Sequence, residues 1–250
     1  MTRHTRAFTL VELLLALAIT SILVLLLVSV VSAALSVWEQ GLNQIDTFAN
    51  ARQVLGRIGD EMKGAVVAAA PNQVEFSENV PSLQGSTAPQ PTSSENVFFI
   101  APYPNTGAGD LCVITYRHNN DTHELQRAFV DSQSAWTTGS PKYQSTGYGS
   151  LQWRTIATGV LEFEIQSYSQ QDLDTTTSPT PTPVASWNSI GGSSTMIGKT
   201  PREVAIRIKV VDDRTLAKLT GLFAGNATYD RLVTRAAREF TTNVMLPPSH

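Results

Sequence analysis

The feature that most constrains this chain is a long uncharged and apolar run close to its N-terminus. From Leu13 to Trp38 there is no charged residue. These 26 positions exceed the ~20 that a helix needs to cross the hydrocarbon core of a bilayer. Arg3 and Arg6 precede the run, whereas Glu39 is the first charge after it. This asymmetry predicts one membrane-spanning helix, with its N-terminus in the cytoplasm and the remaining chain across the membrane.

Two other interpretations of the run stay open. A secretory signal peptide has an apolar region of about 7–15 residues followed by small residues at a cleavage site. The run is longer than that, although Ser32-Ala33-Ala34 fits such a site. The second alternative is a plain signal anchor, which is neither cleaved nor assembled with other chains.

Glu12 separates these interpretations. A carboxylate in an apolar helix costs about 2.5–3.5 kcal/mol at full depth in lipid, and a simple anchor gains nothing from it. A filament subunit does gain, because the acid can neutralise the free amine of a neighbouring copy. Such an amine has to be created close by, and cleavage after Ala7 would create one at position 8.

Residues 7–13, Ala-Phe-Thr-Leu-Val-Glu-Leu, resemble the prepilin processing motif of type IV pilins and type II secretion pseudopilins. In that family a membrane-embedded aspartyl peptidase cuts before the Phe and methylates the new amine. The resemblance implies cleavage between Ala7 and Phe8, N-methylation of Phe8, and an assembly role for Glu12 as the fifth mature residue. The family usually has Gly before the cut, where this chain has Ala7, the smallest alternative side chain.

This resemblance divides the chain into a leader peptide (1–7), a transmembrane and assembly helix (8–38), an amphipathic continuation of that helix (39–70) and a periplasmic head (71–250). The helix is expected to end near Ala69, because Pro71 disfavours helix at the residue before it. The continuation carries apolar residues mostly at spacings of three and four, which is typical of an amphipathic helix. These are Trp38, Leu42, Ile45, Phe48, Leu55, Ile58 and Met62.

After Pro71 the pattern changes to strands separated by polar loops. Turn residues at 119–121 predict a β-hairpin over 111–130, and residues 215–222 predict a short helix capped by Asp212 or Asp213. The fold class is therefore α+β, with a long N-terminal helix packed on an antiparallel sheet, as in pilins. Strands are expected at 96–100, 111–117, 124–130, 160–165, 204–210 and 240–246, and loops at 77–95, 131–150 and 169–200. The last loop contains a Thr/Pro tract at 174–183.

The C-terminal half narrows the resemblance. Residues 201–212 are similar to a late strand of the minor pseudopilin J family, and residues 238–247 to its closing strand. PilW-type minor pilins share these features. The resemblance implies a structural subunit of a type II secretion pseudopilus at the inner membrane, whose partners are the prepilin peptidase, other pseudopilins or minor pilins, and inner-membrane lipid. The alternative from another class is a membrane-tethered extracytoplasmic binding or enzymatic domain exported by the prepilin route.

Residues that carry chemistry are few. The single cysteine, Cys112, excludes an intramolecular disulfide and is interpreted as a small buried hydrophobe. His118 and His123 flank the hairpin turn and are interpreted as solvated rather than metal-ligating, and Asp212 and Asp213 as helix caps rather than calcium ligands. The chain has no HExxH, P-loop or nucleophile-elbow motif and no basic stripe for nucleic acid. We therefore expect no catalysis, no cofactor, no metal and no nucleic-acid partner.

Overall fold

The structure, a computed structural model, contains two compact units, Met1–Ile45 and Asp46–His250. Helix α1 (Leu10–Met62) contributes its first part to one unit and its last part to the other. Each unit is described by itself below. The residues that the structure describes are 10–68, 73–83, 95–103, 111–138, 143–148, 151–169, 182–184, 186–191 and 196–247.

Helix α1 ends earlier than the sequence suggested. It stops at Met62 rather than near Ala69, so the expectation of a helix up to residue 70 is wrong in its last two turns. Gly64 follows in a turn, and glycine is a poor helix former. The amide of Val66 then donates to the carbonyl of Ile100 at 2.8 Å instead of to a helical carbonyl. A bridge to a strand therefore takes the place of the last turns of the helix.

A five-stranded antiparallel sheet forms the first layer of the second unit. Its strands follow the chain order, β1-β2-β3-β4-β5. The expected hairpin is confirmed, because β3 and β4 pair around a turn in which the Asn119 side chain accepts from the amide of Asp121 at 3.0 Å. The strands are β1 (Ser77–Glu78), β2 (Asn96–Pro102), β3 (Leu111–Asn119), β4 (Glu124–Val130) and β5 (Trp153–Thr158).

A separate three-stranded sheet holds the C-terminal strands β6 (Val160–Tyr168), β7 (Glu203–Val210) and β8 (Arg238–Met245), in that order. All of its pairs are antiparallel. A single residue, Gly159, connects β5 of the first sheet to β6 of the second. Every strand expected from the sequence is present, but the strands form two sheets, and β1 and β5 were not expected.

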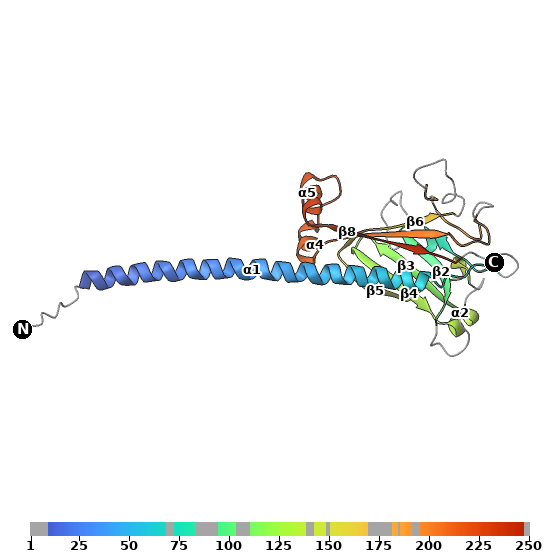
Figure 1. Ribbon diagram of the computed structural model, residues 1–250, viewed down its shortest axis with the longest axis horizontal. Helices are drawn as coiled ribbons and strands as arrows, with labels where there is room; N and C mark the ends of the chain where they lie inside the picture. The colour runs from blue at the N-terminus through green and yellow to red at the C-terminus, as the bar shows by residue number, and fades with distance from the viewer. Residues whose placement is uncertain are drawn as a thin grey trace, which may run out of the picture. The chain divides into compact units, whose positions relative to one another are not determined.

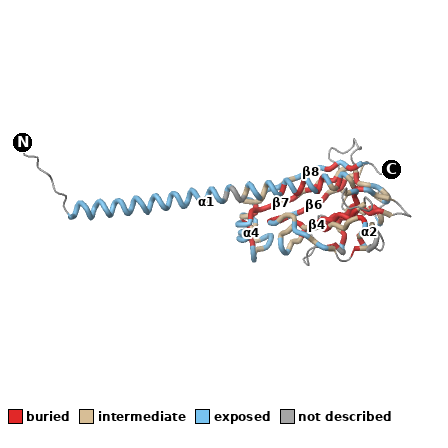
Figure 2. The backbone as a smooth tube through the Cα atoms, turned by 90° about the horizontal axis from the view of Figure 1, so that it is seen from below, coloured by how far each residue is buried: buried red, intermediate tan, exposed pale blue. Residues whose placement is uncertain are grey.

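The part of α1 within the second unit lies along the sheets and supplies one wall of the core (Figure 1). The apolar stripe is confirmed from Phe48 onward, because Phe48 packs against the core and Leu55, Ile58 and Met62 are buried. Trp38 and Ile45 belong to the first unit and are exposed there, so their place in the stripe stays a prediction. Figure 2 shows the buried residues in the strands of the second unit and exposed residues along the helix of the first. The largest buried side chains of the main core include Phe76, Phe99, Tyr116, Phe163, Trp187 and Ile206.

Short helices complete the second unit. Helix α2 (Ser132–Thr138) lies in a stretch expected to be loop, so that expectation is wrong there. Helix α4 (Asp213–Leu219) confirms the short helix, and Asp212 caps it by accepting from the amide of Thr215 at 2.9 Å. Helix α5 (Ala227–Ala236), capped by Asn226, was not expected. The 3₁₀ turns are η1 (Pro81–Leu83) and η2 (Ser145–Gly147), and residues 174–181 of the Thr/Pro tract lie outside the described residues.

Candidate functional site

The first unit presents an apolar helical surface that no described part of the unit covers. From Leu10 to Val37 no side chain of α1 is buried. Among the described residues, α1 is the one helix long and apolar enough to cross a membrane. Such a surface needs lipid or the apolar helices of other chains around it.

Three polar side chains of this segment bond within the helix itself. The hydroxyls of Thr20, Ser21 and Ser36 donate to the carbonyls of Ala16, Leu17 and Ala33 at 2.7, 2.8 and 2.9 Å. An unsatisfied polar group in hydrocarbon costs several kcal/mol, and these bonds avoid that cost. At these three positions the helix is therefore compatible with lipid.

Glu12 lies in the first turn of α1. It is the sole ionisable residue between Leu10 and Trp38. A carboxylate in the first turn interacts favourably with the helix dipole, by about 0.3–1 kcal/mol. Ala7 and Phe8, the residues expected at the cleavage site, lie outside the described residues, so their roles stay predictions.

In the second unit, a buried polar cluster fastens α1 to the five-stranded sheet. We call Glu61 with Arg57, Tyr116 and Arg127 the Glu61 cluster. Arg127 of β4 binds both carboxylate oxygens of Glu61, with its Nε at 3.0 Å and its Nη2 at 2.9 Å. The Tyr116 hydroxyl of β3 donates to the same carboxylate, and the Nε of Arg57 donates at 3.1 Å.

Burial decides the chemistry of this cluster. The side chains of Glu61 and Arg127 are only 7% and 11% exposed. Burial, followed by the adjacent Glu61 carboxylate, raises the pKa of Tyr116 well above its usual value. The phenol therefore stays protonated and acts as a donor at physiological pH. Since Tyr116 and Arg127 come from β3 and β4, the cluster joins the helix to two strands at one point.

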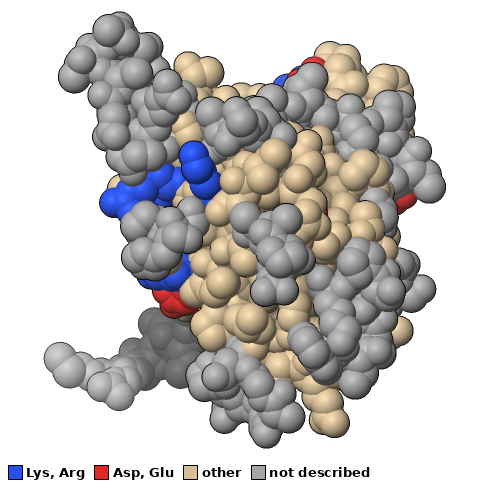
Figure 3. Space-filling model, turned by 90° about the vertical axis from the view of Figure 1, so that its right-hand side faces the viewer, with Lys and Arg blue, Asp and Glu red and all other residues tan. Residues whose placement is uncertain are grey.

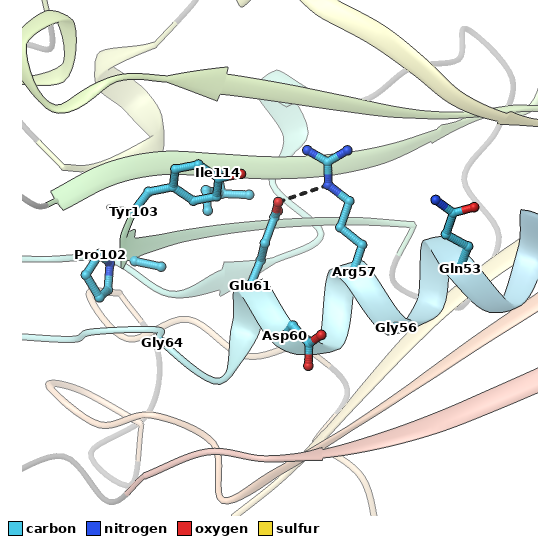
Figure 4. A pocket seen from close by; sticks show the side chains of 10 residues that line it. Gln53, Gly56, Arg57, Asp60, Glu61, Gly64, Pro102, Tyr103 and Ile114 are labelled. Atoms are coloured by element: carbon cyan, nitrogen blue, oxygen red, sulfur yellow. Dashed lines mark hydrogen bonds and ion pairs between the residues drawn. The ribbon is translucent and has the colours of Figure 1, made fainter. Parts of the chain in front are cut away.

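A hollow of about 600 Å³ opens beside the cluster (Figure 4). Its walls come from the last turns of α1, from the end of β2 and from β3. This site was not expected from the sequence, because Glu61 has no local pattern that points to partners 55 and 66 residues away. The lining residues are Gln53, Gly56, Arg57, Asp60, Glu61, Gly64, Ala101, Pro102, Tyr103 and Ile114.

The histidines differ from the expectation. His118 is 1% exposed on β3, with its Nε2 at 2.7 Å from the carbonyl of Val160 and its Nδ1 at 3.8 Å from Glu95. The interpretation as a solvated turn residue is therefore wrong for His118, because the strand reaches into the core at that position. His123 is partly buried, and desolvation lowers its pKa. No group of three or more potential metal ligands occurs among the described residues. Cys112 is fully buried, as expected.

Figure 3 shows the end of the second unit at the right of Figure 1. Most of the visible described surface is uncharged, with basic side chains gathered at one edge. On this face, the described residues form no broad basic stripe of the kind that binds nucleic acid.

An apolar N-terminal helix with an acid in its first turn, followed by an α+β domain, defines a class: single-pass, membrane-anchored, pilin-like proteins. The family model described as the prokaryotic N-terminal methylation motif matches residues 2–28. This match supports a place for the chain in the prepilin-type family of pilins and pseudopilins. No curated protein matches the chain.

Proposed function

We propose that the protein is a minor pseudopilin-like structural subunit of a type II secretion pseudopilus, and that it is assembled through α1. The methylation motif over residues 2–28 carries this proposal, because it leads directly into a helix whose apolar surface is exposed. In this role the prepilin peptidase cuts between Ala7 and Phe8, the head lies in the periplasm, and other pseudopilins are the partners. The role requires no catalysis by the chain itself.

Cleavage and assembly are linked through charge. Cutting after Ala7 gives Phe8 a cationic amine, four residues before Glu12. In a filament the apolar helices exclude water, so each of these charges needs a partner. Neighbouring subunits that are offset along the filament axis can pair the Glu12 carboxylate of one copy with the Phe8 amine of the next.

The first expected result concerns processing. Mature protein should begin at N-methyl-Phe8, which leaves 243 of the 250 residues after removal of 7. Mass spectrometry of the N-terminal peptide measures this directly. Ala7→Gly, which restores the family's usual residue, should be cut at the same bond and at least as completely. A start between Ala33 and Leu35, or an intact Met1, would contradict the proposal.

The second expected result concerns Glu12. Glu12→Ala should leave membrane insertion and cleavage intact but weaken capture of partner prepilins, because a lone buried charge costs roughly 3–5 kcal/mol. Glu12→Asp should be intermediate, since the carboxylate remains on a shorter arm. Co-purification from detergent measures capture, alongside a cleavage assay. Glu39→Ala, at the first charge after the apolar run, is the matched control and should behave as wild type. Equal capture by Glu12→Ala and wild type would remove the assembly role.

Two alternatives are distinguished by the same experiments. A PilW-like minor type IV pilin would also need Glu12, but would co-purify with pilins instead of pseudopilins. The hollow beside Glu61 favours, as a second candidate, a membrane-tethered extracytoplasmic binding domain. Such a domain would keep its activity as a single chain in the Glu12→Gln variant.

A further inference from the structure

The loop between α4 and α5 carries an exposed aromatic side chain. Phe223 is 70% exposed, which is more than any other large apolar side chain described outside α1. The next most exposed are Met245 at 54% and Ile197 at 47%. A phenylalanine presented in this way to water loses the favourable burial of most of its ring.

The loop holds Phe223 in a defined conformation. Gly221 and Gly225 have φ angles of +83° and +89°, which residues other than glycine rarely adopt. The carbonyl of Phe223 accepts from the amide of Asn226 at 3.1 Å. A small apolar cluster packs against both α4 and α5. Its buried members are Leu161, Val211, Leu219 and Val233. The turn therefore holds Phe223 in its exposed position.

The two helices on either side of this loop carry exposed basic side chains. Arg214 and Lys218 on α4, and Arg231 and Arg235 on α5, are all exposed. The acids of the two helices are Asp213 and Asp230, which gives four positive and two negative charges, or +2, in a chain of −3. None of the four basic residues forms an ion pair with a described residue. Residues 220–229 carry no charge, and the acid at the tip is Asp230, whose carboxylate accepts from the amide of Gly225 at 3.3 Å. The net charge of the two helices is still positive.

The hairpin lies at the end of the second unit where α1 enters it. Helix α5 leads into β8, and Phe240 near the start of β8 packs against Phe48 of α1 with 5.7 Å between ring centroids. Figure 1 shows α4 and α5 at this end of the three-stranded sheet. Phe48 follows Trp38 by ten residues, which is about 15 Å of helix. The covalent chain therefore limits how far Phe48 can lie from the end of the apolar run.

We propose that the α4–α5 hairpin docks onto the membrane that holds α1, with Phe223 in the headgroup region and its basic flanks on anionic phospholipid. Aromatic side chains favour the boundary between headgroups and acyl chains, and a negative leaflet attracts nearby Lys and Arg. The inference rests on the proposed anchorage of α1. Docking gives the head a second point of attachment and so a fixed orientation on the bilayer before assembly.

The test uses the full chain, one copy per nanodisc, with a nitroxide label on Phe223→Cys, Ile197→Cys or Leu25→Cys. Cys112 is buried, and a labelled wild-type sample serves as the blank. Relative accessibility to oxygen and to a water-soluble nickel chelate reports depth. In discs containing phosphatidylglycerol, the label at 223 should be shielded from nickel. The label at 197 lies at the other end of the same sheet, where Thr200 contacts Pro247 after β8, and should stay accessible.

Charge is tested separately. Each basic residue near an anionic surface favours docking roughly fivefold, so Lys218→Gln with Arg231→Gln should lower the docked-to-undocked ratio roughly 25-fold. Lys199→Gln, at an exposed lysine at the far end of the sheet, should leave this ratio unchanged.

Equal nickel access at 223 and 197, while the label at 25 is in lipid, would overturn docking and leave the anchorage intact. A label at 25 outside lipid would overturn the anchorage itself. Shielding at 223 that appears only with two copies per disc would identify a second copy as the partner and also overturn the proposal.

Discussion

Replacing Glu61 with alanine should lower the free energy of unfolding of the second unit by roughly 3–5 kcal/mol. The substitution removes the carboxylate that accepts from Arg127, Tyr116 and Arg57. The Arg127 side chain, only 11% exposed, would then carry a charge without its partner. Denaturant unfolding of the full chain in detergent, followed by the fluorescence of the buried Trp187, measures the change.

The neighbouring residue Asp60 provides the matched control. Its ion pair with Lys63 is exposed on both sides, at 76% and 62%, and such pairs contribute about 0–1 kcal/mol. Asp60→Ala should therefore be close to wild type, whereas Glu61→Gln should fall between, because the amide oxygen still accepts one bond. A Glu61→Ala protein no less stable than Asp60→Ala would show that the cluster does not fasten α1 to the sheet.

Gly159→Ala should be the most damaging substitution of a glycine in the described chain. Gly159 has φ +69°, and a Cβ there would lie 2.3 Å from the carbonyl oxygen of Val211. The strained backbone alone costs about 1–3 kcal/mol, and the contact adds a shift of the backbone. That shift would break the bond of 2.9 Å from the amide of Val211 to the Gly159 carbonyl. The expected result is loss of folded protein, seen as a lower melting temperature and poor recovery.

Gly221→Ala separates the two causes. Gly221 has a similarly positive φ of +83°, but a Cβ there meets nothing within 4 Å. Its cost should be that of the strained backbone only. If both alanine variants melt at the same temperature, the contact with Val211 has no energetic weight, and Gly159 is required for its φ angle alone.

Local patterns were sufficient for much of the fold. In β7, the apolar residues alternate with polar ones, and Val204, Ile206 and Ile208 are buried as the period of two requires. The β3–β4 hairpin followed from turn chemistry at Asn119. The uncharged run predicted the helix of the first unit, because charge and length alone decide whether a segment can span lipid.

The features that were missed depend on distant parts of the chain. Strand β5 has no clear alternation of buried and exposed residues, and it forms by pairing with the free edge of β4. Helix α5 is stabilised by Val233, which packs on Leu161 and Val211 from elsewhere in the sequence. His118 is buried because its strand continues into the core. The turn residues next to it had suggested a solvated position. The Glu61 cluster joins three elements, and no window of sequence contains all of its members.

The internal hydroxyl bonds of α1 also bear on reversibility. Lipid tails are as apolar as leucine, so exchanging them for the helices of other subunits has little hydrophobic driving force. The Thr20, Ser21 and Ser36 hydroxyls are already bonded and need no new partner in either place. In the proposed role, transfer of α1 from the bilayer to a filament would therefore change the free energy little along this stretch. The balance between lipid and the proposed filament would then depend on the ends of the helix and on the heads, and such a filament could release its subunits back into the lipid.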